Sequence, residues 1–96
     1  MNKVEAMFLS NICKNTTTRS MLTAHRLIKE ISTNVLISSA NELVFKARYL
    51  YLTASVESAD KANQLAYQIA AELDARHVDT RDIQRKVEEN FDMINV

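Results

Sequence analysis

The sequence contains no glycine and no proline, although average usage would give a chain of this length about seven glycines and about five prolines. A P-loop, a dinucleotide-binding fingerprint, a nucleophile elbow and an EF-hand all need glycine where the backbone takes positive φ or approaches a ligand closely. These four kinds of site are therefore excluded. Tight two-residue hairpins also depend on glycine, so a many-stranded antiparallel fold is not expected. The composition predicts an all-α protein.

Cysteine and long apolar runs are scarce too. Cys13 is the only cysteine, so the chain cannot form an internal disulfide or a cysteine-based metal knuckle. No apolar run approaches the roughly 20 residues of a membrane-spanning helix, and the first residues lack the pattern of a signal peptide. We therefore expect a cytoplasmic protein that binds no membrane and folds as a single helical domain over residues 1–96.

Neither sign of charge is in excess, because 12 Lys and Arg balance 12 Asp and Glu. This balance argues against a dedicated nonspecific nucleic-acid binder. The charges are nevertheless uneven along the chain: residues 1–50 hold seven basic and three acidic side chains, whereas residues 51–96 hold five and nine. Such asymmetry suits pairing of the two halves within one fold, head-to-tail alignment of two copies, or an anionic partner. Pairing within the fold is the favoured expectation.

Apolar residues recur at helical spacing in several segments. A first helix is predicted over residues 2–14, and the run from Asn15 to Thr18 predicts a break because its side chains compete for backbone hydrogen bonds. A second helix is predicted from about residue 18 to residue 38. Ser39 and Glu42 have the spacing of a capping box, which predicts the start of a third helix.

A fourth helix is predicted to start at the Ser55, Ser58 and Asp60 cluster, and a last one covers about residues 80–94. Helical phase also continues across residues 40–76, where one unbroken helix would span roughly 55 Å. The break is favoured, because a small domain does not need so long a helix. The predicted fold is a compact bundle of four or five short helices, or one that includes a single long helix across residues 40–76.

Two groups of side chains include residue types that occur in metal sites or catalytic sites. Asp74 and His77 have the i,i+3 spacing of two metal ligands on a helix, but no second such pair accompanies them, so a helix-end role is favoured. Cys13, His25 and Glu30 include the residue types of a nucleophilic site, but nothing in the sequence ties them together. We expect a protein that is not an enzyme and has no cofactor and no metal.

The stretch between Glu5 and Glu30 carries basic residues and hydroxyls without any acidic residue. Free amides at a helix N-terminus, together with arginine, can bind phosphate or carboxylate. Helix capping by the hydroxyls is the favoured interpretation. The candidate anion-binding residues are Thr18, Arg19, Arg26 and Lys29.

A helix-turn-helix DNA reader would use residues 80–91 as its recognition helix, through Arg81, Arg85 and Lys86. Acidic neighbours surround these bases and would repel phosphate. Nucleic acid is therefore not an expected partner.

The third predicted helix is apolar on most sides, which indicates burial or an oligomer contact. Tyrosine is enriched at interfaces, so Phe45, Tyr49, Tyr51 and Leu52 are the candidate interface residues of a homodimer or higher homo-oligomer. The sequence favours a non-catalytic protein-binding module, with sequestration of a phosphate-bearing ligand and DNA-binding regulation as alternatives. In size and helical character the chain is similar to small phage or plasmid regulators, type III secretion chaperones and bacteriocin immunity proteins, and no motif singles out one of these.

Overall fold

The computed structural model describes residues 2–14 and 18–95, apart from the side chains of residues 13, 14 and 18. Over these ranges the chain is all-α and contains no strand, which confirms the predicted fold class. The predicted break at residues 15–18 lies outside the described residues, except for the backbone of Thr18. The elements are α1 (Lys3–Lys14), α2 (Thr18–Leu27), the short 3-10 turn η1 (Ile28–Glu30), α3 (Thr33–Thr53), α4 (Val56–Ala75) and α5 (Arg81–Ile94).

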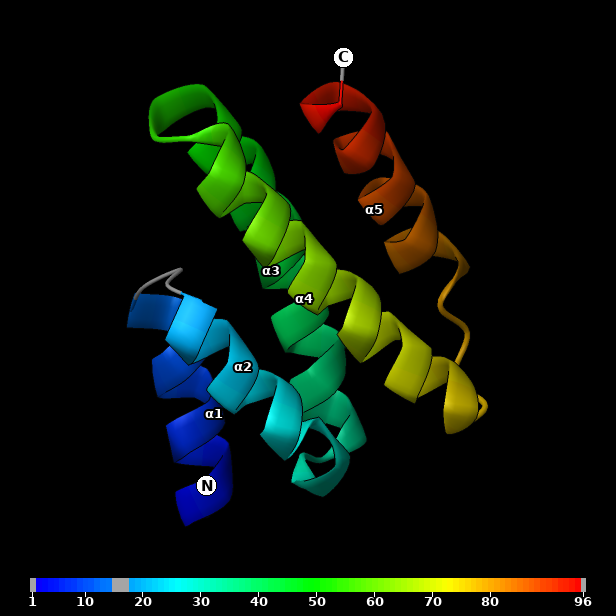
Figure 1. The fold of residues 1–96 in the computed structure, drawn as a ribbon. Helices are drawn as coiled ribbons and strands as arrows, with labels where there is room; N and C mark the ends of the chain where they lie inside the picture. The colour runs from blue at the N-terminus through cyan, green and yellow to red at the C-terminus, as the bar shows by residue number, and fades with distance from the viewer. Residues whose placement is uncertain (1, 15–17, 96) are drawn as a thin grey trace.

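The antiparallel pair of α3 and α4 forms the centre of the molecule (Figure 1). Helices α1 and α2 pack side by side against one flank of this pair, and α5 packs against the other. The Cα radius of gyration is 12.4 Å, close to the value of about 12.5 Å expected for a globular chain of this length. The bundle is therefore compact.

The break between α3 and α4 lies where it was expected. Ser55 is extended, and its Oγ accepts a hydrogen bond of 3.0 Å from the backbone N–H of Ser58. This is the N-cap bond that satisfies one of the free amides of a helix start. Residues 40–76 therefore form parts of two helices, and the alternative of one long helix is excluded.

The prediction of one helix from about residue 18 to residue 38 is wrong. Helix α2 ends at Leu27, and after η1 the backbone is extended at Ile31 and Ser32. Ile28 and Ile31 are both buried, so the apolar spacing continues in phase across the turn. Periodicity alone therefore does not reveal that the helix ends there.

A side chain from the other half of the chain stabilises this turn. The guanidinium of Arg76, just after α4, donates to the carbonyl oxygens of Ile28, Lys29 and Ile31 at 3.3, 3.3 and 2.8 Å. The same group forms an ion pair of 2.9 Å with Glu72. The carbonyl of Ile28 also accepts from the N–H of Ile31 at 3.2 Å. The carbonyls at the end of a helical turn lack a partner within the turn, so Arg76 helps to cap it.

The capping-box prediction at Ser39 is also wrong, because α3 runs without interruption through this position. Leu36, Ala40 and Leu43 are all buried, so one apolar face continues from the first turns of α3 into its middle. Ser39 is buried as well, and its Oγ has no hydrogen-bond partner in the described part of the chain. Burial of this face outweighs the local preference of Ser39 for a helix start.

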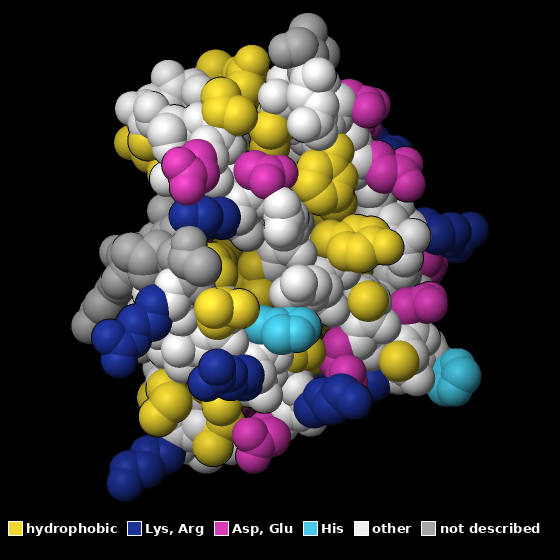
Figure 2. Space-filling model, viewed as in Figure 1, with side chains coloured by type: hydrophobic (Ala, Val, Ile, Leu, Met, Phe, Trp, Pro, Cys, Tyr) yellow, Lys and Arg dark blue, Asp and Glu magenta, His cyan; other side chains and the backbone are white. Residues whose placement is uncertain are grey.

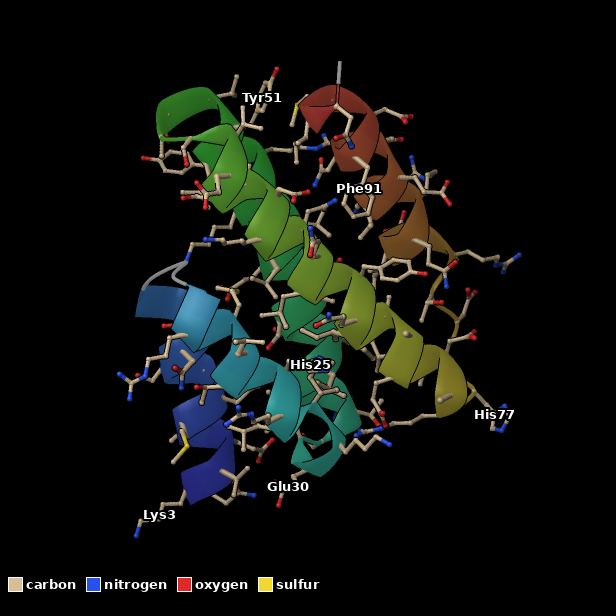
Figure 3. The ribbon with its side chains drawn as sticks, in the orientation of Figure 1. Lys3, His25, Glu30, Tyr51, His77 and Phe91 are labelled. Carbon is tan, nitrogen blue, oxygen red and sulfur yellow. The ribbon has the colours of Figure 1, made fainter. Side chains whose placement is uncertain are left out.

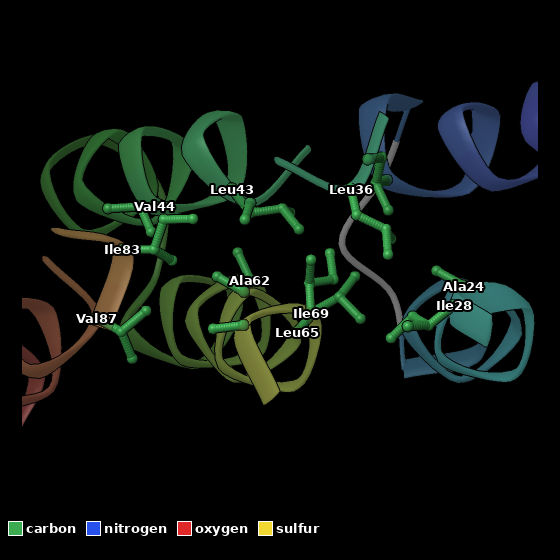
Figure 4. Close-up of a cluster of buried hydrophobic side chains, with 14 of the residues drawn as sticks. Ala24, Ile28, Leu36, Leu43, Val44, Ala62, Leu65, Ile69, Ile83 and Val87 are labelled. Atoms are coloured by element: carbon green, nitrogen blue, oxygen red, sulfur yellow. The ribbon is translucent and has the colours of Figure 1, made fainter. Parts of the chain in front are cut away.

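The core lies between the central pair and the helices on both of its flanks. Leu43 and Val44 of α3 face Ala62 and Ile69 of α4, with side chains from α2 and α5 at the two ends (Figure 4). The predicted apolar face of α4 is fully buried. Met7 of α1 lies outside this core, because more than half of it is exposed.

Helix α4 ends in a Schellman motif without glycine. His77 has a φ of 65°, a left-handed conformation that glycine adopts more easily than other residues. The N–H of Val78 donates to the carbonyl of Leu73 at 3.0 Å, and the N–H of His77 to that of Asp74 at 2.9 Å. The predicted helix-end role of His77 is thus realised by its backbone, while its side chain points into solvent (Figure 3).

No helix in the described ranges combines the length and the apolar character needed to cross a membrane.

Candidate interface surfaces

The outer face of α3 carries a row of large exposed apolar side chains. Phe45, Tyr49 and Leu52 are 76%, 61% and 78% exposed. Their spacing of four and three residues places them on one side of a helix. Most large apolar residues of a folded chain are at least half-buried, so a contiguous row of three marks a surface suited to contact with another molecule. We call these three residues the α3 stripe.

A hollow of about 870 Å³ adjoins the stripe, between the outer face of α3 and the end of α1. Phe45 and Tyr49 form one part of its wall, and Ile12 of α1 forms another. Lys46 spans the gap, where its Nζ donates to the carbonyl oxygen of Ile12 at 2.9 Å. The remaining lining residues are Asn34, Ile37, Ser38, Asn41, Glu42 and Leu43.

Tyr51 does not belong to the α3 stripe. Two residues correspond to a rotation of about 200° around a helix, so Tyr51 and Tyr49 leave α3 on nearly opposite sides. Tyr51 is only partly exposed and lies at the end of the molecule where α3 approaches α5 (Figure 3). The four interface candidates therefore separate into a stripe of three residues and one residue on a different face.

The four anion-binding candidates lie along α2 and η1. Arg19 is in the first turn of α2, and Arg26 is in the last turn, about 10.5 Å further along the axis. Lys29 follows in η1, and all three side chains are exposed. The side chain of Thr18 lies outside the described part. These residues lie in a row along α2 and η1 and are not clustered around the N-terminus of α2.

Arg19, Arg26 and Lys29 give this row three positive charges. None of Arg19, Arg26 and Lys29 makes an ion pair with a carboxylate among the described residues, and Figure 2 shows basic side chains spread over the part of the surface that α1 and α2 form. The expected pairing of the two halves is represented by Arg48 and Glu89, at 2.7 Å. Each of the other ion pairs in the described ranges joins residues close in sequence within the second half.

The basic side chains of α5 are occupied by its own acidic residues. Arg85 pairs with Asp82 at 2.6 Å, and Lys86 pairs with the same carboxylate at 3.0 Å. The side-chain hydrogen bond from Arg81 is the main reason that the pKa of Asp79 is lowered to about 2, so this carboxylate stays charged at neutral pH. Helix α5 therefore presents alternating charges, and these disfavour its use as a DNA recognition helix.

A buried polar cluster links the three helices α3, α4 and α5, and sequence reasoning missed it. Asn63 and Asn90 are fully buried, and the amide of Asn90 donates to Oδ1 of Asn63 at 3.1 Å. Arg48 Nε in turn donates to Oδ1 of Asn90 at 2.8 Å. The missed signal was the position of Asn90 on the same helical face as Val87 and Ile94, where an apolar residue would be expected.

The two groups with residue types of metal or catalytic sites are not assembled into a site. His25 and Glu30 are both exposed, and the side chain of Cys13 lies outside the described residues. Among the residues that the structure describes, no group of three or more His, Cys, Asp or Glu side chains is arranged to hold a metal ion.

Comparison with models of known protein families, with curated proteins and with solved structures finds no match to this chain.

Proposed function

We propose that this chain is a small non-catalytic protein-binding module of the cytoplasm, an adaptor, inhibitor or regulator, that acts as a homo-oligomer. The main support for this proposal is the exposed apolar surface of the α3 stripe. Water contact with apolar surface costs about 25 cal/mol for each Å², so a row of Phe45, Tyr49 and Leu52 stabilises an assembly that covers it. Tyrosine and phenylalanine are also the residues that dominate the buried centres of protein interfaces.

A second copy of the chain suits this surface because the stripe and the hollow lie next to each other. Two copies related by a two-fold axis bury the same surface on both partners. If α3 of one copy crosses α3 of the other in antiparallel fashion near Phe45, then Tyr49 lies opposite Asn41 and Leu52 lies opposite Ser38. Both Asn41 and Ser38 line the hollow. The protruding row of one copy would therefore enter the hollow of the other.

The composition of the surface suits such a contact. A stable interface buries about 800 Å² on each partner, so the stripe would form its centre and the residues around the hollow would have to add the rest. The two aromatic residues and Leu52 would supply the apolar centre, and polar lining residues such as Asn34 and Glu42 would form the rim. This arrangement of apolar centre and polar rim is typical of protein interfaces.

Sedimentation equilibrium of the full chain tests the proposal. The wild-type protein should sediment as a dimer or larger species of the 10.9 kDa chain. Leu52→Glu places a charge in the apolar part of the interface and should weaken association by about 2–4 kcal/mol, the range of an interface hot spot. Tyr67→Glu is the matched control, because Tyr67 is an exposed aromatic on α4 outside the stripe.

Two results would contradict the proposal. One is a wild-type chain that remains monomeric at the highest concentration at which it is soluble. The other is an equal loss of association in Leu52→Glu and Tyr67→Glu, which would mean that the α3 stripe has no special role. Circular dichroism of both variants shows whether the helices are retained.

A further inference from the structure

The exposed side of α2 is a row of two arginines with a leucine between them. Arg19, Leu22 and Arg26 lie within about 60° of one another around a helix with 3.6 residues per turn. Both arginines are exposed, and Leu22 is 53% exposed. Met21 and Ala24, on the opposite side of the helix, are buried in the core. We call Arg19, Leu22 and Arg26 the α2 ridge.

The ridge carries two positive charges and no negative one. Helix α2 contains no acidic residue, and in the described ranges no carboxylate forms an ion pair with Arg19 or Arg26. Arg19 also lies in the first turn of α2, where the positive end of the helix dipole disfavours a cation. An anion bound next to Arg19 would offset this local repulsion, whereas Arg26 lies in the last turn, where the dipole favours a cation.

A hollow beside the ridge gives the surface an apolar part and a second rim. It has a volume of about 300 Å³ and lies between α2 and α4, with Leu22 and Leu65 among its walls. His25 is at its α2 edge, next to α4 (Figure 3). Glu57, Asp60 and Lys61 of α4 form part of the opposite edge, where Lys61 pairs with Glu57 at 3.1 Å and Asp60 leaves a net negative charge. A ligand that fits here meets the arginines of the ridge on one flank, apolar surface in the middle and a weakly negative edge on the other flank.

We propose that the α2 ridge docks a helical segment of another protein that carries two carboxylates seven residues apart, with an apolar side chain between them. Two residues seven apart on a helix are separated by about 10.5 Å along its axis, which is the separation of Arg19 and Arg26. The apolar side chain of the partner then packs on Leu22 and enters the hollow. This inference rests on the proposed function, since it names the partner that the binding module takes.

The same residues favour a polypeptide over nucleic acid. The phosphates of nucleic acid form a continuous row of negative charge, and Glu57 and Asp60 at the far edge of the hollow would repel it. A partner helix can place its carboxylates on the flank toward α2 only and leave neutral or basic residues toward α4. Leu22 adds to the preference, because an exposed leucine gains nothing from contact with a phosphate backbone.

Fluorescence anisotropy with a synthetic helical peptide tests the proposal. The probe carries two glutamates seven residues apart with a leucine between them, and its matched control has glutamine in place of both glutamates. The full chain should bind the glutamate peptide at least about tenfold more tightly, which corresponds to about 1.4 kcal/mol. Added salt should weaken this binding, because the ridge is exposed.

Variants of the chain locate the binding. Arg19→Gln/Arg26→Gln should weaken binding of the glutamate peptide by about tenfold, and Leu22→Ala should weaken it as well. Arg81→Gln/Arg85→Gln removes two positive charges from α5 instead and should leave the affinity unchanged. All three variants alter exposed side chains, so the fold should be retained.

Several outcomes would overturn the inference. Equal affinity for the two peptides, equal weakening by the two double variants, or tighter binding of a DNA duplex than of the glutamate peptide would each exclude an acidic helical partner on the ridge. A smaller oligomer in Arg19→Gln/Arg26→Gln would mean that the ridge contacts a second copy instead. Because the α3 stripe is tested by Leu52→Glu, failure of the ridge and failure of the proposed oligomer can be told apart.

Discussion

The side-chain amide of Asn90 donates a hydrogen bond of 3.1 Å to Oδ1 of Asn63, and both residues are fully buried where α4 and α5 meet. Asn90 also donates to the carbonyl of Val44 at 3.0 Å, and Asn63 donates to that of Val87 at 3.1 Å. With the bond from Arg48, the cluster satisfies the buried amides and joins three helices. Buried polar groups stabilise a fold only when their hydrogen bonds are made, so this cluster helps to determine how α5 docks.

Asn90→Ala should lower the free energy of unfolding by about 3 kcal/mol, because Oδ1 of Asn63, Nε of Arg48 and the carbonyl of Val44 each lose the hydrogen bond that they make with Asn90. Urea denaturation at a fixed chain concentration measures this loss. Asn95→Ala is the control, since Asn95 is exposed and its side chain bonds only to its own helix. A change in Asn90→Ala no larger than in the control would mean that the cluster does not hold α5.

Arg76→Met should lower the free energy of unfolding by about 2–3 kcal/mol, because three carbonyl oxygens in and just after η1 each lose the hydrogen bond from Arg76. Hydrogen exchange provides a second readout: the backbone amides of residues 24–32 should exchange faster than in the wild type, with little change in α5. Arg81→Met removes an exposed arginine and should change stability by less than about 0.5 kcal/mol. Unchanged exchange over residues 24–32 would contradict the role assigned to Arg76.

Ser39→Ala should raise the free energy of unfolding by about 1 kcal/mol. The substitution removes a buried hydroxyl without a partner and introduces a better helix former. Ser10→Ala serves as the control, because Ser10 is exposed on α1 and should gain only about 0.5 kcal/mol from helix propensity. If Ser39→Ala is less stable than the wild type, the hydroxyl of Ser39 has a partner.

His77→Gly should raise the free energy of unfolding by about 0.5–1 kcal/mol. Glycine relieves a left-handed strain of about 1–2 kcal/mol, and part of that gain is offset by the greater freedom of glycine in the unfolded chain. The melting temperature should rise by about 3–6 °C for a domain of this size. His77→Ala keeps the strain and should show no such rise, and a rise of the same size in His77→Ala would contradict the explanation.

The fold class and the helices α1, α4 and α5 could be predicted from the sequence, because they depend on local information. The absence of glycine and proline, the apolar periodicity of α4 and α5, and the Ser55 cap are all visible within a few residues. The turn at Ile28–Glu30 could not be predicted, because it is stabilised by Arg76, more than 40 residues further along the chain. The predicted helix start at Ser39 was wrong for a related reason, because burial of one face of α3 outweighs a local capping pattern.

The candidate surfaces were predictable in part. The spacing of Phe45, Tyr49 and Leu52 indicates a shared face, but the sequence does not tell whether such a face is covered by another helix of the chain. Tyr51 was predicted to be an interface residue with them, but its angle around α3 places it on nearly the opposite side from Tyr49. The basic residues of α2 were visible in the sequence, and their spacing alone places Arg19 and Arg26 on one face of a helix; the exposure of that face required the structure.

Native mass spectrometry of the full chain, purified gently from its own host, tests the central claim most directly. We expect an oligomer that contains two or more copies of the 10.9 kDa chain. This oligomer is either bare or bound to another protein. A 10.9 kDa monomer with nothing bound would contradict the assignment of the α3 stripe as a homo-oligomer interface. An oligomer that retains a nucleotide-sized mass would contradict the protein-binding account and favour sequestration of a phosphate-bearing ligand.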